Sequence, residues 1–148
     1  MTENILTLTK INYTKRIFNG MSLVIIFCIL ILVYGHIISQ YINTLFLCSI
    51  IIIKALLFNS IRNKVYIYQI DKLQNKILIG YLYKNEEKFV EINIDLFGIE
   101  YDYLWYSYPI VNFIRFKQNG IEYLRQYHCG EWTMNLAKEV LKKFKSKP

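Results

Sequence analysis

The sequence predicts a membrane protein: an α-helical hairpin in the bilayer, joined to a small α+β cytoplasmic domain of about six antiparallel strands closed by one C-terminal amphipathic helix. Three observations lead to this prediction. Residues 17–53 contain no Asp, Glu, Lys or Arg. After about residue 60, apolar and polar residues alternate with the period of two that is typical of half-buried strands. Near the C-terminus, apolar residues recur every four positions, as they do on one face of a helix.

The uncharged stretch is long enough for two membrane spans, because one helical span takes roughly 20 apolar residues. A polar break at residues 39–44 divides the stretch, and we expect spans at about 18–38 and 41–59. The short turn between them makes the two helices antiparallel neighbours. Lys54 lies near the end of the second span, where its long side chain can carry the charge to the interface. The alternative of a cleaved signal peptide requires a shorter apolar core and a small-residue cleavage site.

Flanking charge predicts the orientation of the hairpin, because Lys and Arg favour the cytoplasmic side of a membrane. The basic residues that flank the stretch are Lys10, Lys15, Arg16, Lys54, Arg62 and Lys64. The turn carries none, so both termini are expected in the cytoplasm. His36, near the outer interface, is either an interfacial polar residue or a proton-linked switch. Residues 1–16 have apolar side chains near helical spacing and are expected to form a short amphipathic segment on the inner surface.

The chain therefore divides into a membrane part, residues 1–60, and a cytoplasmic domain, residues 61–148. The formal charge of the chain is +7. The cytoplasmic domain holds 14 Lys and Arg against 10 Asp and Glu, which leaves it +4. Such an excess serves membrane topology, anionic lipid or an anionic ligand. The three cysteines, Cys28, Cys48 and Cys129, lack the spacing of metal or redox motifs, and the missing disulfide framework fits a reducing cytoplasm.

Six strands are expected in the cytoplasmic domain, and they lie at about 65–70, 77–83, 89–95, 99–105, 110–118 and 121–128. Asn119-Gly120 predicts a two-residue hairpin turn between the last two strands. That turn places Lys117 opposite Glu122, Phe116 opposite Tyr123 and Ile114 opposite Arg125. The expected buried face consists of Ile114, Phe116, Ile121, Tyr123 and Tyr127, and the expected wet face of Arg115, Lys117, Glu122, Gln126 and His128.

A helix is expected from Glu131 onward, because apolar residues recur every four positions at Trp132, Leu136, Val140 and Phe144. This apolar stripe is expected to cover an open face or end of the sheet. The basic end of the helix, residues 142–147, either contacts anionic headgroups or is simply solvated.

The residue types argue against an enzyme. His36 and His128 are expected on opposite sides of the membrane. Cys129 adjoins His128, but neighbours in a strand point to opposite faces, which is poor geometry for a catalytic dyad. The sequence contains no Gly-rich phosphate loop, metal-ligand cluster or nucleophile elbow. We therefore expect no catalytic residue, no metal site and no cofactor.

Anion binding is the sharper functional hypothesis, and it rests on four residues of one hairpin. Arg115, Lys117, Arg125 and His128 are basic, and Arg offers planar paired donors that suit phosphate. Arg125 is expected among apolar neighbours, where a charge needs a partner such as phosphate. Aromatic residues that can stack on bases lie nearby in the sequence: Trp105, Tyr106, Tyr108 and Tyr127. The alternative is an ordinary solvated face.

In layout, a two-span hairpin followed by strands and one amphipathic helix resembles bacterial pleckstrin-homology-like membrane proteins, whose soluble fold has seven strands. This resemblance implies a non-enzymatic scaffold or accessory subunit of an inner-membrane complex. The size, the order of parts and the basic soluble domain are also similar to a small two-span membrane effector of type III CRISPR systems.

The second resemblance implies a homo-oligomer, a tetramer, in the bacterial inner membrane. Its cytoplasmic domain is expected to bind cyclic tetra-adenylate, a cyclic oligoadenylate, and its hairpins to alter membrane integrity in antiviral defence. The hypothesis is thus an oligomeric effector that senses an anionic ligand, with the scaffold as the alternative. Double-stranded nucleic acid is not an expected partner.

Overall fold

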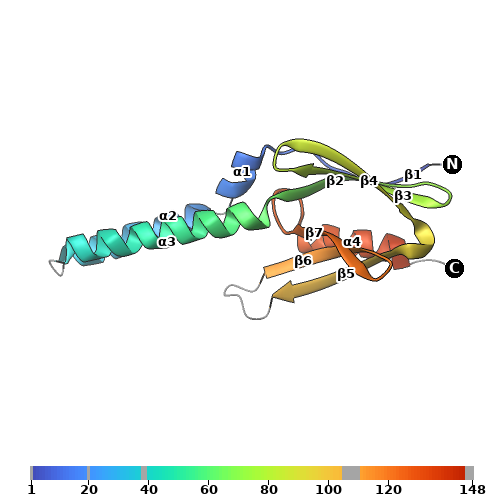
Figure 1. Ribbon diagram of the computed structural model, residues 1–148. Helices are drawn as coiled ribbons and strands as arrows, with labels where there is room; N and C mark the ends of the chain where they lie inside the picture. The colour runs from blue at the N-terminus through green and yellow to red at the C-terminus, as the bar shows by residue number, and fades with distance from the viewer. Residues whose placement is uncertain (1, 20, 38–39, 105–110, 146–148) are drawn as a thin grey trace. The chain divides into compact units, whose positions relative to one another are not determined.

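The structure, a computed structural model, describes residues 2–19, 21–37, 40–104 and 111–145. Within these residues the fold is α+β, with four helices and seven antiparallel strands in two sheets (Figure 1). The chain forms two compact units. Residues 14–62 make a helical unit, and residues 1–13 together with 63–148 make a β-rich unit. The first 13 residues, which the sequence assigned to the membrane part, thus belong with the strands.

The helical unit contains α1 (Tyr13–Phe18), α2 (Met21–Ile37) and α3 (Tyr41–Arg62). Contacts between the helices have antiparallel order. Near one end, Asn59 donates a 3.0 Å hydrogen bond to the carbonyl of Ile17. Further along, the thiol of Cys48 lies 3.4 Å from the carbonyl oxygen of Cys28. At the turn, a Cβ on Gly35 would collide with the Thr44 side chain, so only glycine permits this close approach.

Each helix of the pair buries a narrow stripe and exposes the rest of its apolar surface. The buried residues of α2 are seven apart, Met21, Cys28 and Gly35, and Cys48 lies on the facing stripe of α3. Large apolar side chains cover the other faces of both helices. Of the helices described, α3 is long and apolar enough to cross a membrane, and α2 is a shorter apolar helix of 17 residues.

The β-rich unit has two antiparallel sheets. The first has the order β1-β2-β3-β4 and the second the order β5-β6-β7. The strands are β1 (Glu3–Thr7), β2 (Val65–Lys72), β3 (Lys76–Tyr83), β4 (Glu86–Asn93), β5 (Phe97–Leu104), β6 (Val111–Gln118) and β7 (Ile121–Tyr127). A 3-10 turn, η1 (Ile94–Leu96), joins the sheets, and α4 (Met134–Lys145) follows β7.

The count of about six strands was too low, and β1 is the strand that the sequence analysis missed. Residues 3–7 were expected in an amphipathic segment, but they pair antiparallel with β2, from Glu3 opposite Lys72 to Thr7 opposite Gln69. The register shifts between Asn4 and Leu6, and the adjacent residues Ile5 and Leu6 are both buried. An irregular strand with neighbouring buried residues lacks the period of two, which is why the pattern did not reveal it.

The expected pairing of the last hairpin was right at the turn and wrong beyond it. Lys117 does lie opposite Glu122, but the register then shifts. Phe116 lies opposite Leu124 rather than Tyr123, and Ile114 lies opposite Gln126 rather than Arg125. One extra residue in a strand reverses the face of every residue after it.

The bulge at Tyr123 reverses the face of the β7 residues that follow it. Ile114 and Phe116 are buried as expected, but Tyr123 at the bulge and Ile121 beside the turn are exposed, with 51% and 73% of their surface accessible. Gln126, which was expected on the wet face, is fully buried. Its side-chain oxygen accepts a 2.7 Å hydrogen bond from the backbone N–H of Ile67 on β2, and this bond joins the two sheets.

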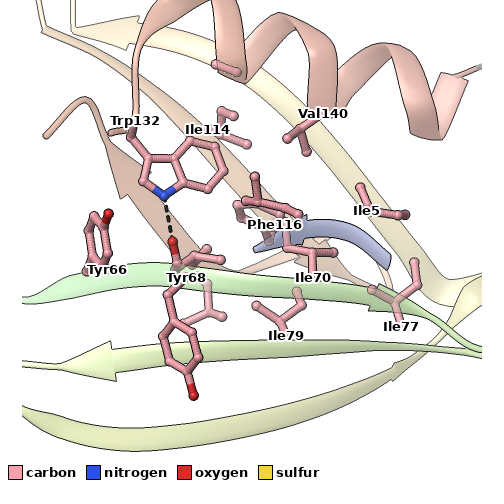
Figure 2. Packing of buried hydrophobic residues seen from close by; sticks show 14 of the residues in the cluster. Ile5, Tyr66, Tyr68, Ile70, Ile77, Ile79, Ile114, Phe116, Trp132 and Val140 are labelled. Carbon is pink, nitrogen blue, oxygen red and sulfur yellow. Dashed lines mark hydrogen bonds between the residues drawn. The ribbon is translucent and has the colours of Figure 1, made fainter. Parts of the chain in front are cut away.

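The hydrophobic core lies between the two sheets and α4 (Figure 2). The helix begins at Met134 rather than at Glu131, after Thr133, whose hydroxyl accepts a 3.3 Å hydrogen bond from the N–H of Leu136. Trp132 precedes the helix and is almost completely buried. Its indole N–H donates a 2.6 Å hydrogen bond to the carbonyl of Ile67. Both backbone groups of Ile67, next to the irregularity in β2, are thus bonded by side chains from the second half of the unit.

Candidate functional site

Three of the four predicted anion-binding residues share one face of the second sheet. Arg115 on β6 lies between Glu100 on β5 and Arg125 on β7 in the strand register. Lys117 is two residues from Arg115 on the same strand and therefore on the same face. The antiparallel pairing of β5, β6 and β7 thus brings basic residues from two strands together, as the hypothesis requires.

Carboxylates on the same face pair with every one of these three cations. Arg115 bonds to Asp102 and lies 3.7 Å from a Glu100 oxygen. The ammonium of Lys117 donates a 2.6 Å hydrogen bond to Glu100. The guanidinium of Arg125 donates to both oxygens of Glu122, at 2.8 and 2.7 Å. Three cations thus meet three carboxylates, and this face, which we call the ion-paired face, carries no net charge from these six residues.

Arg125 lies opposite Arg115 and has an acidic partner, Glu122, whereas the predicted register placed it among apolar neighbours. Besides Glu122, its guanidinium reaches the Tyr127 hydroxyl at 3.2 Å and lies 4.5 Å above the centre of the Phe113 ring. The hydrogen bonds to Glu122 raise the pKa of Arg125 above its ordinary value. A bidentate pair stacked on an aromatic ring is a stable arrangement for arginine without any ligand.

His128 does not join the other three residues. It follows the end of β7, and its ring lies 5.9 Å from that of Tyr101. Tyr101 pairs with Ile114, a core residue, so this contact is on the core side of the sheet. Of the aromatic residues proposed for stacking, Tyr127 is close to Arg125, whereas Trp105, Tyr106 and Tyr108 lie outside the described residues.

A cavity of about 260 Å³ at one end of the β-rich unit is a second candidate site, which the sequence analysis missed. Its lining comes from five elements and consists of Lys72, Ile77, Ile94, Phe97, Ile99, Lys143 and Phe144. The two lysines are 71 positions apart in the sequence, so no local sequence motif predicts the site. The one local signal is Lys72 at the end of an otherwise apolar strand face.

In the parts of the chain that the structure describes, no three His, Cys, Asp or Glu side chains lie together in a way that could hold a metal ion.

No family model matches the chain, and neither a curated protein nor a solved structure matches it.

Removing the carboxylates of the ion-paired face is expected to create an anion-binding site, because the charges of its three cations are then no longer neutralised. The triple change Glu100→Gln, Asp102→Asn and Glu122→Gln leaves three clustered cations, so retention on heparin should shift to higher salt. The purified full chain in non-ionic detergent can be compared with a matched variant, Glu86→Gln, Glu91→Gln and Glu139→Gln, which gains the same charge at scattered positions. Equal elution of the two variants would contradict a clustered basic face.

Proposed function

We propose that this chain is a membrane-anchored binding module and not an enzyme. In this proposal α2 and α3 cross the bacterial inner membrane as a hairpin, and the β-rich unit binds a partner in the cytoplasm. The observation that carries the proposal is the place of the hairpin in the fold. It is inserted between β1 and β2, two strands that pair with each other.

The surface of the helical unit supports lipid as its solvent. Large apolar side chains are exposed along both helices, including Leu23, Leu30, Phe46 and Leu57 at 60% or more. Soluble monomers rarely expose contiguous apolar areas of this extent. At 1.5 Å per residue, the 22 residues of α3 extend about 33 Å and the 17 of α2 about 25 Å. Both lengths are close to the roughly 30 Å of a bilayer core.

Strand pairing restricts the number of crossings. Residues 3–7 and 65–72 lie in one sheet, so the two ends of the inserted segment are on the same side of any membrane. A segment that leaves and returns on one side crosses an even number of times. If α3 crosses, then α2 crosses as well. This argument supports two spans independently of helix length and of the flanking basic residues.

The depth of Lys54 fits the same arrangement. It is the single Lys, Arg, Asp or Glu within α3 before Arg62. Contacts place Asn59 beside Ile17 and Cys48 beside Cys28. Lys54 lies between these two levels and so falls near the start of α2 at Met21, where a lysine side chain can extend to the interface.

Two forms of the module remain, and we favour the scaffold or accessory subunit. The seven strands and the closing helix of the β-rich unit equal the strand number that the resemblance to bacterial pleckstrin-homology-like membrane proteins implies. The neutral ion-paired face removes the main reason to place a polyanion there. Such a chain docks a protein or ligand while its hairpin holds it at the membrane.

The second form is the oligomeric effector in antiviral defence that binds cyclic tetra-adenylate. One observation favours it: Arg115, Lys117 and Arg125 share a face. In this form the ligand displaces the carboxylates and binds Arg115, Lys117 and Arg125, while His128, the fourth predicted residue, lies on the other face of the sheet. Two helices cannot enclose a pore alone, so permeation requires several copies, such as a tetramer.

Ultracentrifugation of a detergent-free lysate tests the anchor, and ligand titration separates the two forms. The full chain should pellet with membranes and resist alkaline extraction; a folded, monodisperse chain in the supernatant would overturn the proposal. In detergent, the effector predicts a stable homo-oligomer and saturable binding of cyclic tetra-adenylate, weakened more by Arg125→Ala than by Lys142→Ala. The scaffold predicts no binding at micromolar ligand.

The hairpin itself predicts a specific cross-link. Because Cys28 and Cys48 face each other across α2 and α3, a membrane-permeable oxidant should join them within one chain. Mass spectrometry of the oxidised full chain should find the two peptides linked and Cys129 still free. Cys129→Ser should leave the reaction unchanged, while Cys28→Ser should abolish it. Linkage of Cys28 only to other chains would argue against this pairing of the helices.

A further inference from the structure

We propose that the cavity at the end of the β-rich unit binds a small anionic amphiphile, a carboxylate or phosphate monoester on a short apolar chain. Lys72 and Lys143 hold the anion, and the isoleucines and phenylalanines of the lining hold the chain. This inference rests on the proposed function as a binding module, and it names the class of ligand and the site.

The inner part of the cavity is apolar. Ile77 on β3 is fully buried, and the rings of Phe97 and Phe144 lie with their centres 4.9 Å apart. Ile94 and Ile99 complete this lining. The volume of about 260 Å³ is slightly below the usual range of ligand sites. A short alkyl chain fits this space.

The two lysines stand at the edge of this apolar surface for reasons of backbone geometry. Lys72 is two residues after Ile70, a core residue, and so points to the core face at the end of β2. Lys143 is three residues after Val140 and adjoins Phe144, which places it beside the buried face of α4. An anion between two ammonium groups gains charge-assisted hydrogen bonds, while its chain occupies the apolar part.

Both lysines already contact β1, the strand that precedes the hairpin in the sequence. Lys72 lies 3.7 Å from a carboxylate oxygen of Glu3. Lys143 donates a 2.8 Å hydrogen bond to the carbonyl of Ile5. A bound anion competes with these two β1 oxygens for the same ammonium groups. Because β1 leads into the hairpin, ligand binding should loosen this strand, and by linkage a loosened strand should favour the ligand.

Octanoate and octyl phosphate are suitable probes for the full chain in lipid nanodiscs. Saturable binding is measured by ligand-detected NMR, with empty nanodiscs as the blank for partition into lipid. We expect the Lys72→Gln, Lys143→Gln variant to bind at least ten-fold more weakly. The matched variant Lys76→Gln, Lys142→Gln should bind like wild type, because neither of its lysines lines the cavity. Octyltrimethylammonium, which has the same chain and a positive head, should not bind.

A second variant keeps the charges and removes the space. Ile99→Trp should abolish binding of both probes without altering the two lysines. This variant tests the cavity even if the Lys72→Gln, Lys143→Gln variant does not fold. Amide exchange of residues 3–7 should become faster when octanoate binds. If phosphatidylglycerol in the nanodisc displaces octanoate, the natural anion is a membrane lipid; if it does not, the ligand is a free amphiphile. Either result supports the site.

Two outcomes overturn the proposal: no saturable binding by the wild-type chain, or equal affinity of the wild type and the folded Lys72→Gln, Lys143→Gln variant. Membrane anchoring is measured separately in the same samples. A chain that remains in the bilayer but ignores both probes rejects the cavity and leaves the anchored module intact.

Discussion

Replacing Leu30 and Leu47 together with arginine is expected to abolish stable insertion of the chain into membranes. The two side chains are 62% and 48% exposed, and they lie near the middle of the paired helices on faces that the partner helix does not cover. An arginine near the centre of a span costs about 2.5–3.5 kcal/mol, so two cost roughly 5–7 kcal/mol. That is about four orders of magnitude in the insertion equilibrium. In water, the same changes would make the protein more soluble.

The two environments predict opposite results: arginine removes a lipid-facing hairpin from the membrane but makes a water-facing hairpin more soluble. The fraction of full chain that resists alkaline extraction should fall sharply for the Leu30→Arg, Leu47→Arg variant. Leu57→Arg is the matched control, because Leu57 is three residues beyond Lys54, toward the end of α3, where a long cationic side chain can extend to the interface. If the Leu30→Arg, Leu47→Arg protein were folded and more soluble than the wild type, the exposed faces of the hairpin would lie in water.

Replacing Trp132 with alanine is expected to lower the stability of the β-rich unit by about 3–5 kcal/mol. The indole is among the largest fully buried side chains, and it packs between α4, β6 and β2 (Figure 2). Large aromatic-to-alanine changes in a core cost about 3–5 kcal/mol. The change also removes the donor to the Ile67 carbonyl, an acceptor next to the irregularity of β2. Since small domains have only about 5–15 kcal/mol of stability, this loss is a large part of the total.

A graded series separates packing from hydrogen bonding at this position. Trp132→Phe keeps an aromatic ring but leaves the Ile67 carbonyl without its donor, so we expect an intermediate loss of about 1–3 kcal/mol. Denaturant unfolding of the full chain in detergent, followed by amide exchange of β2 and β7, gives both values. Exposed Met134→Ala, two residues away, is the control and should have little effect. Equal stability of Trp132→Ala and wild type would contradict the assignment of Trp132 to the core.

The parts of the fold with strong local signals were predictable from sequence. The uncharged stretch revealed the two apolar helices, and the alternating pattern revealed six of the seven strands. The strand at Glu3–Thr7 was missed because it pairs with β2, which lies about 60 residues away and beyond the hairpin. Nothing local to five irregularly patterned residues specifies such a pairing. The bulge after Glu122 was missed for a similar reason, since its effect depends on the strand opposite.

The sequence predicted which basic residues share a face of the candidate site, but not their charge balance. Alternation correctly put Arg115 and Lys117 on one face, but their charge balance depends on the neighbouring strand. Glu100 and Asp102 alternate there with the same period, so a pairing of β5 with β6 would have indicated neutralisation. The sequence does not state which strands are neighbours. The cavity with Lys72 and Lys143 was beyond reach altogether, because five elements must be assembled before it exists.

The insertion of the hairpin between β1 and β2 has a consequence for biosynthesis. Residues 3–7 leave the ribosome before the apolar helices, yet their partner strand is synthesised only after them. The β-rich unit can therefore be completed only after both apolar helices have been synthesised. In the proposed two-span arrangement, a nascent chain with one helix left out of the bilayer would place β1 and β2 on opposite sides of the membrane, where they cannot pair. Under that proposal, formation of the first sheet requires both helices of the hairpin to have crossed.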